Sequence, residues 1–174
     1  MRIPGATYRL QLGAGFGFRE ARALLPYLDA LGITDLYLSP IAEARAGSTH
    51  GYDVTDPTRL NPELGDAADF DALVGAVHAR GMGILLDVVP NHMAASVENR
   101  WWRDVLENGQ ASPYARFFDI TWHPAWATLK NRVLLPILAE PYGRTLEAGE
   151  FQLRYTPEGF IVEYRGLVLP VDPR

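Results

Sequence analysis

The stretch Gly83-Ile-Leu-Leu-Asp-Val-Val-Pro-Asn-His-Met93 decides how the rest of the chain is interpreted. Its first part is an apolar run interrupted by one carboxylate, that of Asp87, which is typical of a parallel strand covered on both faces. Pro90 donates no backbone hydrogen bond, so we expect the strand to end there. Asn91 and His92 then follow its carboxyl end, where parallel α/β folds bind ligands. The stretch therefore predicts a polar site, with Asp87 inside the strand as a supporting residue.

Two further strands and two helices precede this stretch in regular alternation. Residues 7–12 alternate between polar and apolar side chains, and residues 35–39 form a short apolar run closed by a proline. Residues 24–31 and 66–80 show helical spacing of apolar side chains, each followed by a glycine. Pro26 lies within the first of these helices and is expected to kink it. The order strand, helix, strand, helix, strand predicts right-handed crossovers and a parallel sheet.

Residues 41–65 are predicted to be a long irregular loop, because glycine, proline, serine, threonine and aspartate are frequent there. Loops of this length in compact domains are usually functional or disordered. Tyr52 could offer its ring to the apolar face of a sugar, and His50 and Asp53 could hydrogen-bond sugar hydroxyls. The alternative is ordinary turn chemistry, and composition alone favours neither interpretation.

The second half of the chain is rich in aromatic side chains. For Trp101 and Trp102, packing in a core is favoured over stacking on sugars, because aromatic clusters are more often structural. Residues 151–155 and 160–165 alternate on either side of a Pro-Glu-Gly segment, which predicts a β-hairpin.

The predicted fold class is α/β, the first part of a (β/α)8 TIM barrel. A closed barrel needs about 250 residues, whereas this chain has 174 residues and about three predicted barrel strands. We expect residues 1–90 to form the first β/α units and residues 91–174 to form a lobe inserted after the third strand. Three strands with bare edges are a poor final state, so we expect the remaining part of the barrel as a partner, either in a longer form of this protein or on a second chain.

Composition excludes several classes of function. The chain is 48% hydrophobic, has a net charge of -5 and contains no cysteine, which excludes disulfides and thiolate chemistry and disfavours nucleic acid or an anionic membrane as a partner. It shows no secretory leader and no stretch long enough to span a bilayer, so we expect a cytoplasmic protein.

Two further types of chemistry are less well supported by the residues. His50, His92 and the neighbouring carboxylates lack the ligand spacing of familiar zinc sites, so we expect neither a metal nor a cofactor. An acid–base pair of Asp53 and Asp87 would require a defined separation, and a sequence does not provide that separation.

The stretch Asp87-Val-Val-Pro-Asn-His92 resembles the first signature region of the α-amylase superfamily, glycoside hydrolase family 13. The segment His50-Gly-Tyr-Asp53 fits the same superfamily. Longer strings, including residues 7–12, 36–41 and 104–119, resemble the family of maltooligosyltrehalose synthases, specifically its amino-terminal part.

This resemblance implies an intramolecular transglucosylase, active in trehalose biosynthesis, that converts the reducing-end α-1,4 bond of a maltooligosaccharide into an α,α-1,1 bond. It implies that Tyr52 stacks on the sugar, that His92 hydrogen-bonds it, and that Asp87 and Asn91 hold the site together. Asn91 is a calcium ligand in many members, but further ligands cannot be identified here.

The family's reacting carboxylates lie on later strands, in motifs that are absent from these residues. We therefore expect no catalytic residue in this chain, and no activity from the chain alone. The alternatives are an α-glucan hydrolase of the same superfamily, or a non-catalytic carbohydrate-binding or assembly module.

Overall fold

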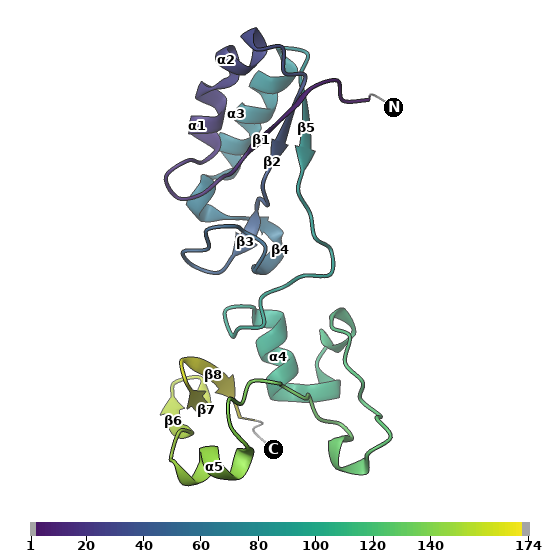
Figure 1. Ribbon diagram of the computed structural model, residues 1–174, viewed down its shortest axis with the longest axis vertical. Helices are drawn as coiled ribbons and strands as arrows, with labels where there is room; N and C mark the ends of the chain where they lie inside the picture. The colour runs from purple at the N-terminus through teal and green to yellow at the C-terminus, as the bar shows by residue number, and fades with distance from the viewer. Residues whose placement is uncertain (1–2, 172–174) are drawn as a thin grey trace. The chain divides into compact units, whose positions relative to one another are not determined.

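The computed structural model describes residues 3–171, and the chain divides into two compact units, Met1–Ala94 and Ala95–Arg174. Each unit has its own sheet (Figure 1). Each also has its own buried side chains, so the two are described separately. The predicted boundary lies between residues 90 and 91, whereas the division between the units follows Ala94.

Unit 1 is built on a parallel sheet whose three strands lie in the order β1-β2-β5. These strands are β1 (Thr7–Leu10), β2 (Asp35–Leu38) and β5 (Gly83–Leu86). Thr7 pairs with Asp35 and Asp35 pairs with Gly83, so the strands start at the same level. Their carboxyl ends consequently meet at one edge of the sheet. This arrangement confirms the predicted parallel α/β character.

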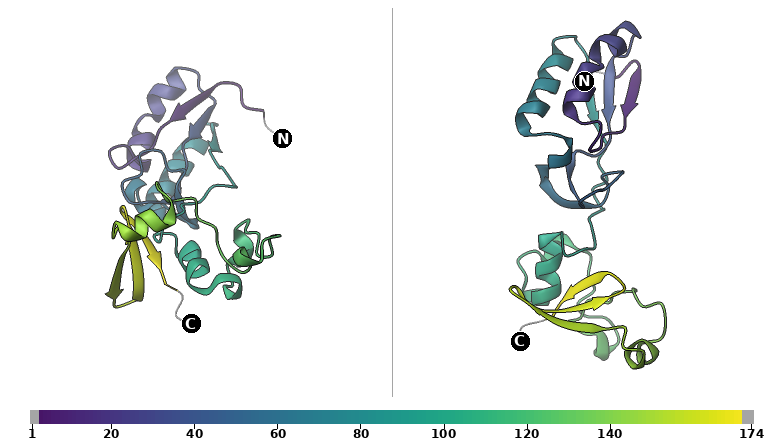
Figure 2. Two further views of the ribbon diagram at one scale, coloured as in Figure 1. Left: turned by 60° about the horizontal axis from the view of Figure 1, so that its bottom comes forward. Right: turned by 90° about the vertical axis from the view of Figure 1, so that its left-hand side faces the viewer.

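Three helices connect these strands: α1 (Phe18–Ala23), α2 (Leu25–Ala30) and α3 (Ala67–His78). They cover one face of the sheet (Figure 2). The helix predicted over residues 24–31 is confirmed as α2, whereas the kink predicted at Pro26 is wrong. Helix α1 was not predicted, and it meets α2 at Leu24. Pro26 lies in the first turn of α2, where its missing N–H has no helical partner to lose.

The core of unit 1 lies between the helices and the sheet. Leu36 and Leu38 of β2 are fully buried there, as are Leu28 of α2 and Leu73 and Val77 of α3. Because a strand's side chains alternate between its two faces, the neighbouring residue Tyr37 lies on the opposite face, away from the helices. That second face carries the polar side chains described below.

Strand β5 ends earlier than predicted. Its last residue is Leu86, so Asp87 lies beyond the strand and the expectation that it lies inside is wrong. The last ladder bond runs from the Asp87 N–H to the Leu38 carbonyl, 3.0 Å. The neighbouring strand is soon followed by Pro40, which has no N–H with which to continue the ladder. Pro40, rather than Pro90, therefore coincides with the end of the pairing.

The predicted burial of β5 on both faces is also wrong for this chain. Leu85 is 37% exposed and Leu86 is 45% exposed, and they lie on opposite faces of the strand. The described residues of this chain therefore do not cover both faces of this apolar strand.

Residues 41–65 are more regular than predicted. They contain β3 (Ala42–Ala44) and β4 (Val54–Leu60), which pair in antiparallel fashion, and a 3₁₀ turn at Pro62–Leu64. Register shifts interrupt the pairing, and Pro57 lies inside β4, so neither strand shows a regular period. The segment between β3 and β4 stays a loop and carries His50, Tyr52 and Asp53.

Unit 2 combines short helical segments with an antiparallel sheet of order β6-β7-β8. The predicted hairpin is confirmed, because Tyr155 pairs with Phe160 and Thr156 with Gly159; the third strand was not predicted. The elements are α4 (Arg100–Asn108), 3₁₀ turns at Gly109–Ala111, Ala115–Phe117 and Ala127–Leu129, α5 (Tyr142–Glu147), β6 (Gln152–Thr156), β7 (Gly159–Tyr164) and β8 (Leu167–Pro170).

The aromatic side chains of unit 2 pack against one another. The ring of Trp101 stacks on Tyr114 at 5.7 Å and contacts Phe117 at 5.1 Å, and the ring of Trp102 lies 5.0 Å from Phe118. Both tryptophans are half-buried, which supports the preference for core packing. Within residues 3–171, none of the helices has the length and apolar character needed to cross a membrane.

Candidate functional site

The carboxyl end of β5 brings together side chains from three separate segments of unit 1. The Tyr52 hydroxyl donates a hydrogen bond to Oδ2 of Asp87, with an oxygen–oxygen distance of 2.7 Å. Nη2 of Arg9, from β1, lies 3.2 Å from the same carboxylate oxygen and 3.4 Å from the Tyr52 hydroxyl. The Asp87 side chain is only 12% exposed, so its charge is largely compensated by these two donors.

These contacts fix the protonation states at the site. The Tyr52 hydroxyl bond, with a further contribution from Arg9, holds the pKa of Asp87 below its usual value, although desolvation acts in the opposite direction. The same bond to Asp87 raises the pKa of Tyr52, since the phenol must keep its proton to donate it. Asp87 is therefore an ionised acceptor at neutral pH, which suits a supporting role and not that of a proton donor.

The loop that carries Tyr52 is held by its own polar side chains. Nδ1 of His50 accepts a hydrogen bond from the Tyr52 N–H at 3.0 Å, and the two rings stack at 5.8 Å. Asp53 accepts a hydrogen bond from the Ser48 hydroxyl and lies 3.8 Å from Nδ1 of His50. Gly51 has a φ of +77°, and a Cβ there would lie 3.1 Å from the Pro40 carbonyl oxygen. The predicted residues His50 and Asp53 thus shape the loop in this structure.

Tyr52, Asp87 and His92 line one cavity of about 380 Å³, which is within the usual size range of ligand pockets. Its remaining lining is mainly apolar and includes residues from β4 and from the segment that follows β5. His92 is exposed, and its Nδ1 lies 2.8 Å from Oδ1 of the neighbouring Asn91. Asn91 is not among the residues that line the cavity. An apolar hollow with a phenol, a carboxylate and an imidazole suits a polyhydroxylated ligand with apolar faces.

Sequence reasoning missed Arg9. The alternation of residues 7–12 places Arg9 opposite the buried Leu10 and Leu12, and this pattern is visible in the sequence. The register pairs Arg9 with Tyr37, and the guanidinium carbon lies 5.4 Å from the centre of that ring. The sequence did not show that the face carrying Arg9 and Tyr37 is the one on which the site lies.

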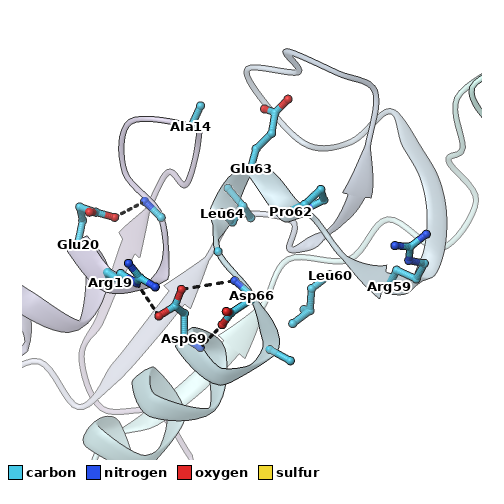
Figure 3. Close-up of a pocket in the computed structure, with 13 residues that line it drawn as sticks. Ala14, Arg19, Glu20, Arg59, Leu60, Pro62, Glu63, Leu64, Asp66 and Asp69 are labelled. Carbon is cyan, nitrogen blue, oxygen red and sulfur yellow. Dashed lines mark hydrogen bonds and ion pairs between the residues drawn. The ribbon is translucent and has the colours of Figure 1, made fainter.

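Several of the charged residues that line a second hollow, drawn in Figure 3, pair with one another. Arg19 lies 2.7 Å from Asp69, and Asp69 and Asp66 form the reciprocal cap of α3. Glu20 accepts from the N–H of Gly17 at 2.9 Å. These bonds serve helix ends, so they give the second hollow a structural role. Among residues 3–171, no group of three or more histidine, cysteine, aspartate or glutamate side chains could hold a metal ion.

The fold and the site define the class of protein. Residues 22–144 match the family model of the α-amylase catalytic domain. The chain therefore belongs to the α-amylase family, whose catalytic domain implies part of a TIM barrel.

Along nearly its whole length the chain is similar to maltooligosyl trehalose synthases. It is 43% identical to one so named in Mycobacterium tuberculosis, over 97% of this chain and 21% of that protein. A crystal structure of a maltooligosyl trehalose synthase matches with a TM-score of 0.86 and 38% identity, over 97% of this chain and 22% of that one. The synthase from Arthrobacter ramosus matches with a TM-score of 0.81 and 38% identity, over 98% and 21%.

Members of the family with other names match a smaller share of the chain. The α-amylase SusG from Bacteroides thetaiotaomicron is 40% identical over 64% of this chain and 16% of its own length. The chain thus spans about a fifth of the length of the synthases that it matches.

Proposed function

We propose that this chain is the amino-terminal, glucan-binding portion of an enzyme that makes maltooligosyl trehalose from maltooligosaccharides. The observation that carries the proposal is the cavity shared by Tyr52, Asp87 and His92, in a chain whose similarity to maltooligosyl trehalose synthases covers 97% of its length. The relative named α-amylase SusG matches only 64% of it, which favours the isomerase over the α-glucan hydrolase.

In this proposal the residues of the chain bind the sugar and do not break its bond. Tyr52 presents its ring to the apolar face of a glucose unit, because its hydroxyl is already engaged by Asp87. His92 is exposed at the cavity and hydrogen-bonds a sugar hydroxyl. Asn91 orients the His92 ring, while His50 and Asp53 hold the loop in the conformation that presents Tyr52.

The reaction itself is assigned to carboxylates outside these residues. One carboxylate attacks the anomeric carbon and forms a glycosyl-enzyme as the bond to the departing oxygen breaks. A second, protonated carboxyl group donates its proton to that oxygen and later removes the proton of the attacking hydroxyl. The released glucose then attacks through its own anomeric hydroxyl, which yields the α,α-1,1 bond in place of the α-1,4 bond. Water must be kept out while the glucose turns, which requires the remainder of the barrel as a partner.

Binding of maltopentaose to the chain tests the proposal. We expect the Tyr52→Ala variant to bind about 10-fold more weakly, since a lost stacking ring is worth ~1.4 kcal/mol, and His92→Ala to bind more weakly as well. Tyr27→Ala is the matched control, because Tyr27 is 61% exposed on α2 and does not line the cavity. Isothermal titration calorimetry measures all four proteins, and equal affinities for them would contradict the assignment.

A further inference from the structure

We propose that Arg9 and Gln11 position the loop that carries Tyr52. Arg9 lies in β1 and Gln11 lies directly beyond it, on the face of the sheet opposite the helices. The inference deepens the proposed function and rests on it, because it explains how the sugar-stacking residue is held in place.

Arg9 connects the two ends of the polar cluster at the carboxyl end of the sheet. One guanidinium nitrogen, Nη2, reaches both the Tyr52 hydroxyl and the Asp87 carboxylate, at 3.4 and 3.2 Å. The guanidinium carbon lies over the Tyr37 ring, 5.4 Å from its centre, and this contact restricts where the guanidinium can move. Arg9 is therefore held by the Tyr37 ring while its guanidinium nitrogens bond the Tyr52 hydroxyl and the Asp87 carboxylate.

Gln11 extends the same connection to the backbone of the loop. Its Oε1 accepts a hydrogen bond from Nη1 of Arg9 at 2.8 Å, and its Nε2 donates to the carbonyl of Thr49 at 3.4 Å. The edge of β1 thus contacts the loop at two points, the Thr49 carbonyl and the Tyr52 hydroxyl. Two anchors on either side of His50 and Gly51 fix the tilt of the Tyr52 ring, which a single hydrogen bond would leave free.

The chemistry of this arrangement requires arginine. Only a planar fork can bond Gln11 with one nitrogen while it bonds the Asp87 carboxylate and the Tyr52 hydroxyl with the other. A lysine would supply the charge but could not keep both connections. Arg9 acts through Tyr52 and Asp87, so it is a positioning residue.

Amide hydrogen exchange in the unliganded chain tests this inference directly. The Gly51 and Tyr52 amides are bonded within the loop to the Ser48 hydroxyl and to His50, at 3.0 Å each, so their exchange reports loop opening. We expect Arg9→Met to speed exchange at both by about 10-fold, and Arg9→Lys to give an intermediate value.

Arg19→Met is the matched control, since it removes an exposed arginine and an ion pair of 2.7 Å with Asp69, away from the loop. It should leave exchange at Gly51 and Tyr52 unchanged. Gln11→Met removes the second anchor without touching the ion pair of Arg9, and should also speed exchange in the loop. If neither the Arg9→Met nor the Gln11→Met protein exchanges faster there than wild type, the inference is wrong.

Maltopentaose titrations of the same proteins separate the inference from the proposed function. Weaker binding by Arg9→Met, together with faster loop exchange, supports positioning for the sugar. If the Arg9→Met protein shows faster loop exchange but binds maltopentaose as tightly as wild type, positioning of Tyr52 for the sugar is ruled out. Failure of the wild-type chain to bind at all overturns the proposed function instead, and the exchange rates then decide whether Arg9 holds the loop.

Discussion

The oxygen Oδ2 of Asp87 accepts contacts from two side chains that are far apart in the chain, Tyr52 and Arg9. The motif around Asp87 and His92 and the loop around Tyr52 were visible as chemistry in the sequence. Their common cavity was not, because it depends on how the loop between β3 and β4 folds back over the end of β5. Arg9 could have been found from strand alternation only if the ligand-facing side of the sheet had been known.

Removal of the Tyr52 hydroxyl should change the titration of Asp87. Tyr52→Phe deletes the largest cause of its lowered pKa, so we expect the pKa to rise toward the ordinary value of 3.8. Carbon-13 NMR of the carboxyl group measures it, with Tyr27→Phe as the control. An unchanged pKa in Tyr52→Phe would show that the hydrogen bond is not formed in solution.

Tyr52→Phe should also change how the free energy of unfolding depends on pH. The folded-state pKa of Asp87 lies below its unfolded value, so ionised Asp87 contributes stability above about pH 4, and this contribution is lost as the pH falls through the folded-state pKa. Tyr52→Phe should therefore lower the free energy of unfolding near neutral pH. Between about pH 7 and about pH 3, the free energy of unfolding of this variant should fall by less than that of wild type. Urea unfolding at the two pH values measures the difference, and a steeper loss than in wild type would contradict the expectation.

At the scale of elements, the periodic patterns were predicted well and the aperiodic ones were not. Helix α3 has a clear apolar stripe and a capping aspartate, and it forms where expected. Strand β4 contains a proline and pairs across register shifts, so no period marks it. The predicted end of β5 was too late, at Pro90, because the residues of β5 do not show which strand lies beside it. The pairing ends near Pro40, which follows the neighbouring strand β2.

Helix α2 offers a matched test of which face is buried. Leu28 is fully buried against the sheet, whereas Leu31, at the end of the same helix, is 53% exposed. We expect Leu28→Ala to lower the free energy of unfolding by about 2–5 kcal/mol. Leu31→Ala should change it by no more than about 0.5 kcal/mol. Denaturant unfolding followed by circular dichroism measures both, and similar losses in the two variants would contradict the described packing.

The loop between β3 and β4 depends on the glycine at its centre. Gly51 has a positive φ, and an added Cβ would come within 3.1 Å of the Pro40 carbonyl oxygen. Gly51→Ala should therefore shift Tyr52 and weaken maltopentaose binding, while Gly15→Ala, where a Cβ meets nothing within 4 Å, serves as the control. Equal affinities of these two variants would contradict a role for the loop conformation.

At the scale of the whole molecule, the chain spans about a fifth of the synthases it resembles. We expect the purified chain to bind maltopentaose without converting it, because the proposed reacting carboxylates lie outside it. Chromatography of the products, together with a reducing-end assay, measures conversion. Loss of reducing ends without release of glucose, by this chain alone, would show that the reacting groups are present after all.

The sequence by itself determined the parallel α/β order of unit 1 and the hairpin of unit 2, because periodicity and turn chemistry are local properties. The residues proposed to bind sugar were chosen from local motifs in the same way. Only the tertiary structure decided where β5 ends, that β3 and β4 pair, and that Arg9 meets Tyr52 and Asp87. Each of these depends on a neighbour distant in the chain, a proline on the adjacent strand or a charge on the opposite edge of the sheet, and no local pattern records such a neighbour.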